Sequence, residues 1–244
     1  MSSPIKLAIN GANGRMGRVL PDLLHDDARF ELVARVNTSN EWAGVPQLDV
    51  VIDFSTPVGF SAALAHCRAN RIALVSGTTG LDAAQLGVID QAVREIAVLH
   101  AANFSLGVAV LTRLVRDAAK ALPDWDLEIL EAHHANKADA PSGTALALGR
   151  AAAAARAQDF DAVAMFARHG QTGARPQHAI GFSSLRAGEI VGEHTAMLAG
   201  PNERVELTHR ASSNAIFAAG ALQVAAWLAG RAPGRYTLDD VLVA

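Results

Sequence analysis

Short apolar runs alternate with longer amphipathic segments along the first half of the chain. The segment after the first run places Met16, Val19, Leu20, Leu23 and Leu24 on one face of a helix. Strands that alternate with helices indicate a parallel sheet covered by helices, as in a Rossmann-type domain. The five apolar runs expected to form its strands span residues 5–10, 30–36, 50–54, 72–76 and 96–100.

The pattern changes after a predicted helix at residues 107–122. Strand-like runs then follow one another with one long helix, 144–157, among them, and this indicates a mixed or antiparallel sheet with that helix on one face. We therefore predict an α/β chain, a Rossmann-type parallel sheet domain plus an α+β domain with a mixed sheet. A last apolar helix, 215–228, is expected to return and cover the first sheet. The runs expected to form the second sheet span residues 126–132, 162–166, 178–185, 189–198 and 204–209.

A glycine-rich turn, GANGRMG at residues 11–17, follows the first strand directly. In a strand–turn–helix context, Gly11 permits the tight turn, Gly14 lets the backbone approach a pyrophosphate, and Gly17 lets the helix pack on the strand. The spacing is GxxGxxG rather than the commoner GxGxxG. Because strand and helix flank it, nucleotide binding is favoured over a purely structural turn.

The end of the second strand does not select between the two nicotinamide dinucleotides. In NAD-selective sites an acidic residue near this point binds the ribose 2′-hydroxyl, and an Arg nearby accommodates the 2′-phosphate of NADP. Here Asn37, Thr38 and Ser39 follow the strand, and the sequence does not give the orientation of Arg35. The connection 40–49 is too short for a usual crossover helix. We therefore expect NADH or NADPH as the cofactor, and the residues after the second strand indicate no preference between them.

Small, polar or glycine residues also follow three other strands of the first half. They form the segments Ser55-Thr56-Pro57, GTTG at 77–80 and AANFS at 101–105. Thr56 is suited to cap a helix, and Pro57 to occupy its first position. Ligands bind at the carboxyl edge of an open parallel sheet, so these segments are expected to meet the dinucleotide there.

The densest group of reactive side chains lies between strand 126–132 and helix 144–157, in EAHHANKADAPSGTA at 131–145. It holds the imidazoles of His133 and His134 and the ammonium of Lys137. Ser142 is a good N-cap, so the next amides would be free to bind an anion at the positive end of the helix. These features predict a site for a carboxylate-bearing substrate beside a titratable imidazole. The alternative is two surface histidines, a solvated lysine and an ordinary capped helix.

Other chemistry for this stretch is less favoured. Glu131, His133 and His134 are not expected to share a metal ion, because adjacent residues of an extended segment point to opposite sides. No metal site is therefore predicted. Asp139 is expected to brace the loop, and His194 to be a structural or interface residue.

Composition argues against several classes of partner, although it leaves a local basic patch open. The net charge of −3 gives no basic excess for nucleic-acid binding. No apolar run approaches the roughly 20 residues of a membrane span, and the start of the chain lacks the features of a secretory signal. We expect a cytoplasmic protein with neither partner. The single cysteine, Cys67, lies in an expected helix and is expected to be a buried structural thiol.

Seven motifs, in order, resemble those of the dihydrodipicolinate reductase family, also called 4-hydroxy-tetrahydrodipicolinate reductases. The resemblance covers nearly the whole chain, and the run at 131–145 is its most specific part. The motifs are GANGRMG (11–17), VVIDFSTP (50–57), GTTG (77–80), AANFSLGV (101–108), EAHHANKADAPSGTA (131–145), RAGEIVGEHTAM (186–197) and THRASS (208–213).

The resemblance implies NAD(P)H-dependent reduction of 4-hydroxy-tetrahydrodipicolinate in the diaminopimelate route to lysine. It also implies a homotetramer, assembled largely through the sheets of the second domain. The expected organisation is a dinucleotide-binding domain (1–104), a substrate-binding and oligomerisation domain (105–213) and a C-terminal segment (214–244) that returns to the first domain.

Roles for individual residues also follow from the resemblance. His133 is expected to be the acid/base residue and Lys137 the proton donor or charge partner. His134, Gly143 and Thr144 are expected to bind the substrate, a small ring with two carboxylates. The residues expected to bind the cofactor are Gly11, Ala12, Asn13, Gly14, Arg15, Met16, Gly77, Thr78, Thr79, Ala101, Ala102, Asn103 and Phe104.

Three places depart from the family pattern. Asn37-Thr38 stands where an acidic residue and an Arg are frequent, and Thr56 and Asn214 stand at positions that often carry Arg. The loss of cationic groups weakens the expectation of NADPH. Two alternatives are a related Rossmann enzyme for another small carboxylate or amino acid, and a dinucleotide-sensing regulator without turnover. The intact HHxxK and PSGTA runs favour the reductase.

Overall fold

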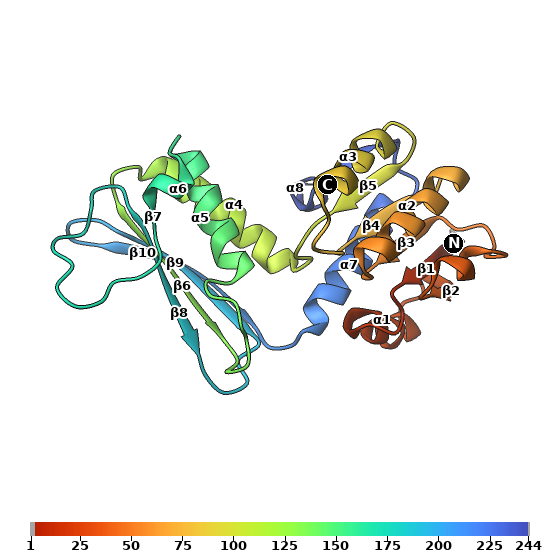
Figure 1. Cartoon of the computed structure of the whole chain (residues 1–244), viewed down its shortest axis with the longest axis horizontal. Coiled ribbons are helices and arrows are strands. Elements are labelled where there is room, and N and C mark those ends of the chain that lie inside the picture. Colours follow the sequence, from red (N-terminus) through yellow and green to blue (C-terminus); the bar gives the residue numbers. More distant parts are fainter. Residues whose placement is uncertain (1–2, 244) are drawn as a thin grey trace. The chain divides into compact units, whose positions relative to one another are not determined.

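The computed structural model describes residues 3–243, which form two compact units (Figure 1). Unit 1 consists of the residues up to Leu106 together with those from Ala215 onward, and unit 2 is Gly107–Asn214. The chain therefore leaves unit 1 once and re-enters it once.

Unit 1 is built on a six-stranded parallel sheet with the order β11-β5-β4-β3-β1-β2. The sequence predicted five of these strands, and the sixth, β11, was missed because Gly234–Tyr236 contains no apolar run. The strand order reverses between β1 and β3, and ligands bind at such a switch point. The strands are β1 (Ile5–Asn10), β2 (Phe30–Val36), β3 (Val50–Asp53), β4 (Ala73–Ser76), β5 (Ala97–His100) and β11 (Gly234–Tyr236).

Helices cover both faces of this sheet (Figure 1). Helices α1 (Arg15–His25) and α7 (Ala215–Leu228) share one apolar cluster with the sheet, and α2 (Pro57–Asn70) and α3 (Ala83–Ala92) share the other. The central strands β3 and β4 are buried along their whole length, which explains the apolar character of these runs in the sequence. A 3₁₀ turn, η1 (Ser39–Trp42), follows β2, and α8 (Leu238–Leu242) ends the unit.

Local signals set where two of these helices begin. Thr56 caps α2 by accepting a hydrogen bond from the Gly59 amide at 3.2 Å, and Pro57 occupies the first turn, as predicted. Asp82 and Gln85 form a capping box at the start of α3. Cys67 lies fully buried in α2, where burial raises the pKa of its thiol, in agreement with a structural role.

Unit 2 is built on a mixed sheet with the order β10-β9-β6-β8-β7. Strand β6 pairs parallel to β8 and antiparallel to β9. The predicted strand at 162–166 is wrong for its first part, because α6 (Phe160–Val163) occupies it and only two residues of β7 follow. The strands are β6 (Asp126–His133), β7 (Ala164–Met165), β8 (Ile180–Arg186), β9 (Gly192–Ala199) and β10 (Arg204–Ala211).

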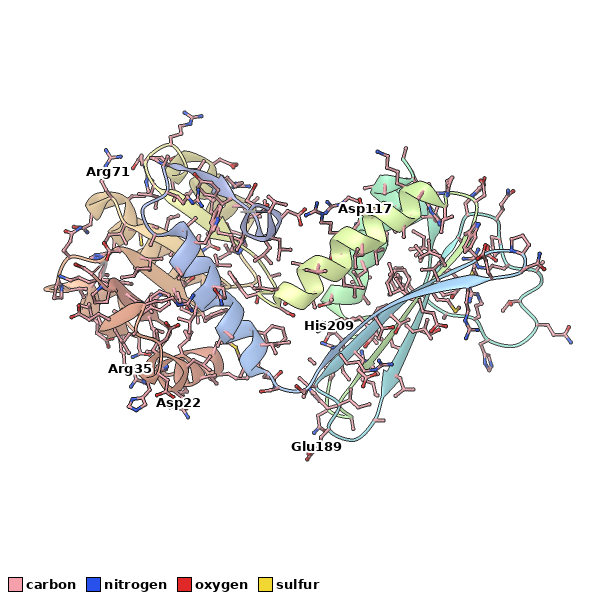
Figure 2. All side chains as sticks on the ribbon, turned by 180° about the vertical axis from the view of Figure 1, so that it is seen from behind. Asp22, Arg35, Arg71, Asp117, Glu189 and His209 are labelled. Atoms are coloured by element: carbon pink, nitrogen blue, oxygen red, sulfur yellow. The ribbon has the colours of Figure 1, made fainter. Side chains whose placement is uncertain are left out.

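The helices of unit 2 cover one face of its sheet (Figure 1). Helices α4 (Leu106–Ala121) and α5 (Gly143–Ala155) bury their apolar residues there, and α5 approaches β8 closely at Gly149. A Cβ at this glycine would lie 2.5 Å from the ring of Phe182. Figure 2 shows the side chains, with Glu189 labelled in the turn that joins β8 to β9.

The opposite face of this sheet carries exposed leucines. Leu130 of β6 and Leu185 of β8 are 41% and 55% exposed. A hollow on this face is lined by Leu130, Ala132, Ser183, Leu185, Glu193 and Thr195, among others. Among residues 3–243, no helix is long and apolar enough to cross a membrane.

Candidate active site

The glycine-rich turn of unit 1 has the close contacts that its sequence predicted. Gly11 has a φ of +79°, and a Cβ on it would lie 2.4 Å from the carbonyl oxygen of Phe54. A Cβ on Gly17 would lie 2.2 Å from the carbonyl oxygen of Gly11. Both positions therefore require glycine, the first for conformation and space, the second for space alone.

The turn delivers an uncapped helix N-terminus to the carboxyl edge of the sheet. Gly14 is the N-cap of α1, and no side chain caps the helix. The turn is held by bonds from the amides of Gly11 and Ala12 to the carbonyl oxygen of Val36, at 2.8 and 3.2 Å. Amides at such an N-terminus favour an anion, so residues 11–16 fit a dinucleotide pyrophosphate.

A buried carboxylate, Asp53, joins the strand ends along this edge. It is fully buried and accepts hydrogen bonds from Asn10 at 2.8 Å, Ser76 at 2.7 Å and Thr78 at 2.8 Å, and another from Ser55. These partners come from the ends of β1, β3 and β4. The network therefore fixes the three loops expected to surround the cofactor.

This network changes what the GTTG segment can offer a ligand. The hydroxyl of Thr78 donates to Asp53 and accepts from the amide of Ser55 at 3.0 Å, and Thr78 is 2% exposed. Its side chain is thus structural, whereas Thr79 is exposed. A Cβ on Gly77 would lie 2.2 Å from the ring of Phe54, so this residue also serves packing.

The segment 101–104 follows β5 at the same edge of the sheet, and it too is held by a buried side chain. Phe104 is 1% exposed and packs edge-on against Phe54, with ring centroids 5.6 Å apart. Asn103 accepts a hydrogen bond from the amide of Ser105 at 2.8 Å. Ala101 is partly buried and Ala102 is exposed. The phenyl ring of Phe104 therefore supports the edge, and the surface there is made by its small neighbours.

In unit 2, strand β6 places Glu131 and His133 on the same side, since alternate residues of a strand share a face. The Glu131 side chain is fully buried and is the acceptor for several donors. His133 Nδ1 lies 2.6 Å from one oxygen, and the two terminal guanidinium nitrogens of Arg186, Nη1 and Nη2, each lie 2.8 Å from a carboxylate oxygen. The amide of Ser142 donates to it at 3.2 Å. One carboxylate thus connects β6, β8 and the start of α5.

This carboxylate is ionised at any ordinary pH. Burial would raise the pKa of Glu131, but hydrogen bonds from Arg186, Ser184 and His133 outweigh that effect and lower the pKa to about 2. An ionised carboxylate only accepts hydrogen bonds, so His133 must carry a proton on Nδ1. Its Nε2 therefore faces away from Glu131, beside Gly192, where an added Cβ would lie 3.1 Å from that nitrogen.

A second buried histidine supports the first. His194 of β9 is 5% exposed, and its ring meets the ring of His133 edge-on, with centroids 5.2 Å apart. Its Nε2 lies 3.0 Å from the hydroxyl of Ser142. Burial, and then the charge of His133, lower the pKa of His194 to about 4, so this imidazole stays neutral. The expected structural role of His194 agrees with these contacts.

The start of α5 has the predicted cap. Ser142 is 2% exposed, and its hydroxyl accepts from the amide of Ala145 at 3.2 Å. Gly143 is exposed and Thr144 is partly buried in the first turn. Lys137 donates to Asp139 at 2.7 Å, which lowers the pKa of Asp139, and the Lys137 amide bonds to the carbonyl oxygen of His134 at 3.1 Å. Asp139 therefore braces the loop, as predicted.

Two contributors to the site were not identified from the sequence. Arg186 lies in a quoted motif, but nothing marked it as the partner of Glu131, because the two are 55 residues apart. Glu41 was also missed, since it stands beyond the end of β2 and reaches back to it through η1. A signal did exist for Asp53, a lone charge in the otherwise apolar run 50–54.

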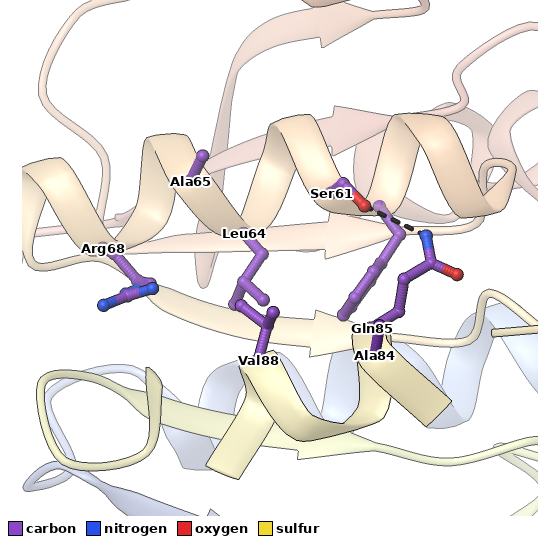
Figure 3. Close-up of a pocket in the computed structure, with 8 residues that line it drawn as sticks. Ser61, Leu64, Ala65, Arg68, Ala84, Gln85 and Val88 are labelled. Carbon is purple, nitrogen blue, oxygen red and sulfur yellow. Dashed lines mark hydrogen bonds between the residues drawn. The ribbon is translucent and has the colours of Figure 1, made fainter. Parts of the chain in front are cut away.

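A separate pocket lies between α2 and α3 (Figure 3). The amide of Gln85 bridges the two helices by donating to Ser61 at 3.0 Å. None of the predicted site residues lines this pocket. Its lining residues are Phe60, Ser61, Leu64, Ala65, Arg68, Ala84, Gln85 and Val88.

Within the described residues, no group of three or more His, Cys, Asp or Glu side chains could hold a metal ion.

Comparison with known proteins matches nearly the whole chain to one family. Residues 5–104 match the family model "Dihydrodipicolinate reductase, N-terminus", and residues 107–242 match "Dihydrodipicolinate reductase, C-terminus". A protein of Alkalilimnicola ehrlichii named 4-hydroxy-tetrahydrodipicolinate reductase is 46% identical, over 97% of this chain and 98% of that protein. A protein of the same name from Xanthomonas campestris pv. campestris is also 46% identical, over 99% of both chains.

Solved structures share the fold. A dipicolinate-bound dihydrodipicolinate reductase from Paenisporosarcina sp. TG-14 superposes with a TM-score of 0.79 at 22% identity, over 96% of this chain and 97% of that one. A probable dehydrogenase from Thermotoga maritima gives a TM-score of 0.58 at 10% identity, over 98% and 93%. The matching family models and full-length relatives show that this chain belongs to the dihydrodipicolinate reductase family and is an oxidoreductase.

Proposed function

We propose that this chain catalyses the NAD(P)H-dependent reduction of 4-hydroxy-tetrahydrodipicolinate to tetrahydrodipicolinate, a step of lysine biosynthesis via diaminopimelate. The full-length relatives named for this activity support the assignment. The observation that carries it is the buried carboxylate of Glu131. One of its oxygens bonds to His133 Nδ1, and the other accepts a hydrogen bond from the amide of Ser142, at the start of helix α5.

The proposed cofactor site lies at the carboxyl edge of the unit 1 sheet. Residues 11–16 would hold the pyrophosphate, since the turn fits no side chain at Gly11 and ends in an uncapped helix. Residues 77–79 and 101–104 would line the nicotinamide side, through their backbone and small side chains. The nicotinamide, when bound, supplies the hydride.

The proposed acid/base residue is His133. Because the Nδ1–H group donates a hydrogen bond to Glu131, the Nε2 atom is the one available to hold or release a proton. Gly192 leaves space beside that atom, and the neutral His194 adds no competing charge. This arrangement suits loss of water from the hydroxylated ring and proton delivery to the carbon next to the reduced one.

The proposed substrate site uses the groups around α5. One carboxylate of the ring would lie on the amides of Gly143 and Thr144, at the positive end of the helix. The other would pair with Lys137 or His134, and Lys137 would then exchange its partner Asp139 for the substrate. Two fixed anion contacts orient the ring, which is the main contribution of the protein to such a reaction.

A paired assay tests this proposal. The purified protein should oxidise NADH or NADPH when it is supplied with freshly made product of dihydrodipicolinate synthase. No turnover with either dinucleotide would exclude the proposed function.

Two variants test the residue roles. Lys137→Ala should weaken dipicolinate binding, and His133→Ala should lower turnover far more than binding. Unchanged dipicolinate affinity in Lys137→Ala would remove that lysine from the substrate site.

The proposed assembly is a homotetramer in the cytoplasm. The exposed leucines on the uncovered face of the unit 2 sheet support an interface between copies there. The cytoplasmic location rests on the biosynthetic role of the family. The expected partners are therefore the dicarboxylate substrate and further copies of the same chain.

A further inference from the structure

An acidic side chain stands at the end of β2, although the strand itself ends in Asn37. Glu41 reaches back from η1, and its Oε2 atom accepts a hydrogen bond from the backbone amide of Asn37 at 2.6 Å. Its Oε1 atom lies 3.2 Å from the hydroxyl of Thr38. The side chain of Asn37 in turn accepts from the amide of Asn13 at 2.7 Å. Asn37 therefore links the carboxylate of Glu41 to Asn13 of the glycine-rich turn through hydrogen bonds.

The turn that carries Glu41 is anchored. The next residue, Trp42, is 8% exposed and stacks on His66 of α2, with ring centroids 4.4 Å apart and planes 23° apart. The amide of Glu41 also bonds to the carbonyl oxygen of Thr38 at 3.2 Å. A buried indole thus fixes the backbone, while Glu41 itself stays exposed. Its position at the end of β2 is a consequence of packing.

A carboxylate at this place discriminates between the two dinucleotides. In Rossmann-type sites the adenosine ribose lies at the end of the second strand, where an acidic group accepts hydrogen bonds from its hydroxyls. The two oxygens of Glu41 have about four acceptor positions, and the protein uses two of them, so two remain for a diol. A 2′-phosphate would instead place its negative charge against the carboxylate.

Neither of two nearby arginines, Arg18 and Arg35, pairs with this carboxylate. Arg18 directs its Nε atom to the carbonyl oxygen of Asn13 at 2.8 Å. Arg35, labelled in Figure 2, belongs to β2 and precedes the strand end by one residue. Residues 37–43 contain no Lys or Arg. The acidic group is thus the charge bonded directly to the strand end.

We propose that Glu41 binds the adenosine ribose hydroxyls and makes this enzyme prefer NADH to NADPH. The proposal rests on the proposed function, because it assumes the dinucleotide site of unit 1. It assigns the discriminating carboxylate to a residue four positions beyond Asn37, on a 3₁₀ turn.

Direct binding measurements test the proposal without turnover. Dissociation constants for NADH and NADPH would be measured by nicotinamide fluorescence for the full-length wild type, Glu41→Gln and Glu31→Gln. The wild type should bind NADH roughly tenfold or more tightly than NADPH, the order expected for one like-charge contact at an exposed site. Glu41→Gln should bring the ratio close to one, chiefly by tightening NADPH.

The control variant also removes one carboxylate charge, but near the start of β2, whereas Glu41 contacts the residues that follow its end. Glu31 is exposed and lies one residue after the start of β2, so Glu31→Gln should keep the wild-type ratio. A merely structural role for Glu41 would weaken both dinucleotides by the same factor, and that outcome would overturn the proposal. A wild-type preference for NADPH that persists in Glu41→Gln would also overturn it and would direct attention to Arg35. Binding of neither dinucleotide to folded wild type would contradict the proposed function itself.

Discussion

At the scale of single residues, Glu131 is the group that holds His133, the proposed acid/base residue. Replacing it with Gln keeps the shape but removes the charge that holds the Nδ1 proton of His133 and pairs with Arg186. We expect Glu131→Gln to lower kcat by about ten- to a hundredfold, part of what acid/base catalysis contributes. Dipicolinate affinity should change much less. Steady-state kinetics and calorimetric titration provide the two readouts.

A matched control is available on the same strand. Glu128 of β6 also accepts hydrogen bonds from two guanidinium groups, those of Arg168 and Arg175, but it does not touch His133. Glu128→Gln should therefore leave kcat near the wild-type value. Equal losses in both variants would indicate a general disturbance of β6 and would refute the positioning role of Glu131.

The buried His194 predicts a pH dependence of stability. Burial holds its pKa at about 4 in the folded protein, below the ordinary value of 6.5. As the pH falls below 6.5, His194 therefore binds a proton in the unfolded chain but stays neutral in the folded one. The free energy of unfolding decreases as a result until about pH 4, by up to about 3 kcal/mol. His194→Gln should lose this part of the decrease. Urea unfolding of both proteins at pH 7 and pH 4.5 measures it.

The exposed His25 at the end of α1 supplies the control for this measurement. His25→Gln should show the same difference between pH 7 and pH 4.5 as the wild type. If His194→Gln also kept the full difference, the acid sensitivity would arise from other groups.

At the scale of elements, two glycines in helices of unit 1 should respond oppositely to the same substitution. A Cβ on Gly220 of α7 would lie 1.8 Å from the carbonyl oxygen of Phe104, so Gly220→Ala should destabilise the protein by about 1–3 kcal/mol or more. Gly87 of α3 has no neighbouring atom within 4 Å of an added Cβ. Gly87→Ala should stabilise by about 0.5–1 kcal/mol, because alanine favours a helix. Thermal unfolding of the pair tests both signs, and a neutral Gly220→Ala would contradict the close approach of α7.

The same elements show which parts of the fold a sequence can predict. Strands β1 and β2 were predicted to the residue, because apolar residues dominate both runs and a glycine-rich or polar segment follows each of them. The short β11 was not, because three residues at a sheet edge need no such run. The end of α6 was assigned to a strand for a related reason, since a run as short as 162–166 does not separate a helix from a strand.

The candidate site divides in the same way. Glycines and caps were predictable, because each is required by its own backbone position: Gly11 by its φ and Ser142 by the amide of Ala145. The partners of buried charges were not, because Glu131 and Arg186 meet only after β6 and β8 pair in register. For Glu41, the missing information was the burial of Trp42, which sets the direction of the turn.

At the scale of the whole molecule, the uncovered face of the unit 2 sheet predicts the assembly state. Leu130 and Leu185 are exposed on neighbouring strands of that face, and a second copy of the chain would remove both from water. We expect Leu185→Arg to convert the proposed tetramer to smaller species, because an unpaired charge would be buried at the contact. Leu86 of α3 is 43% exposed in unit 1, and Leu86→Arg should leave the mass unchanged. Sedimentation velocity measures all three proteins. A wild-type monomer, or a Leu185→Arg variant with the wild-type mass, would place the interface elsewhere or exclude it.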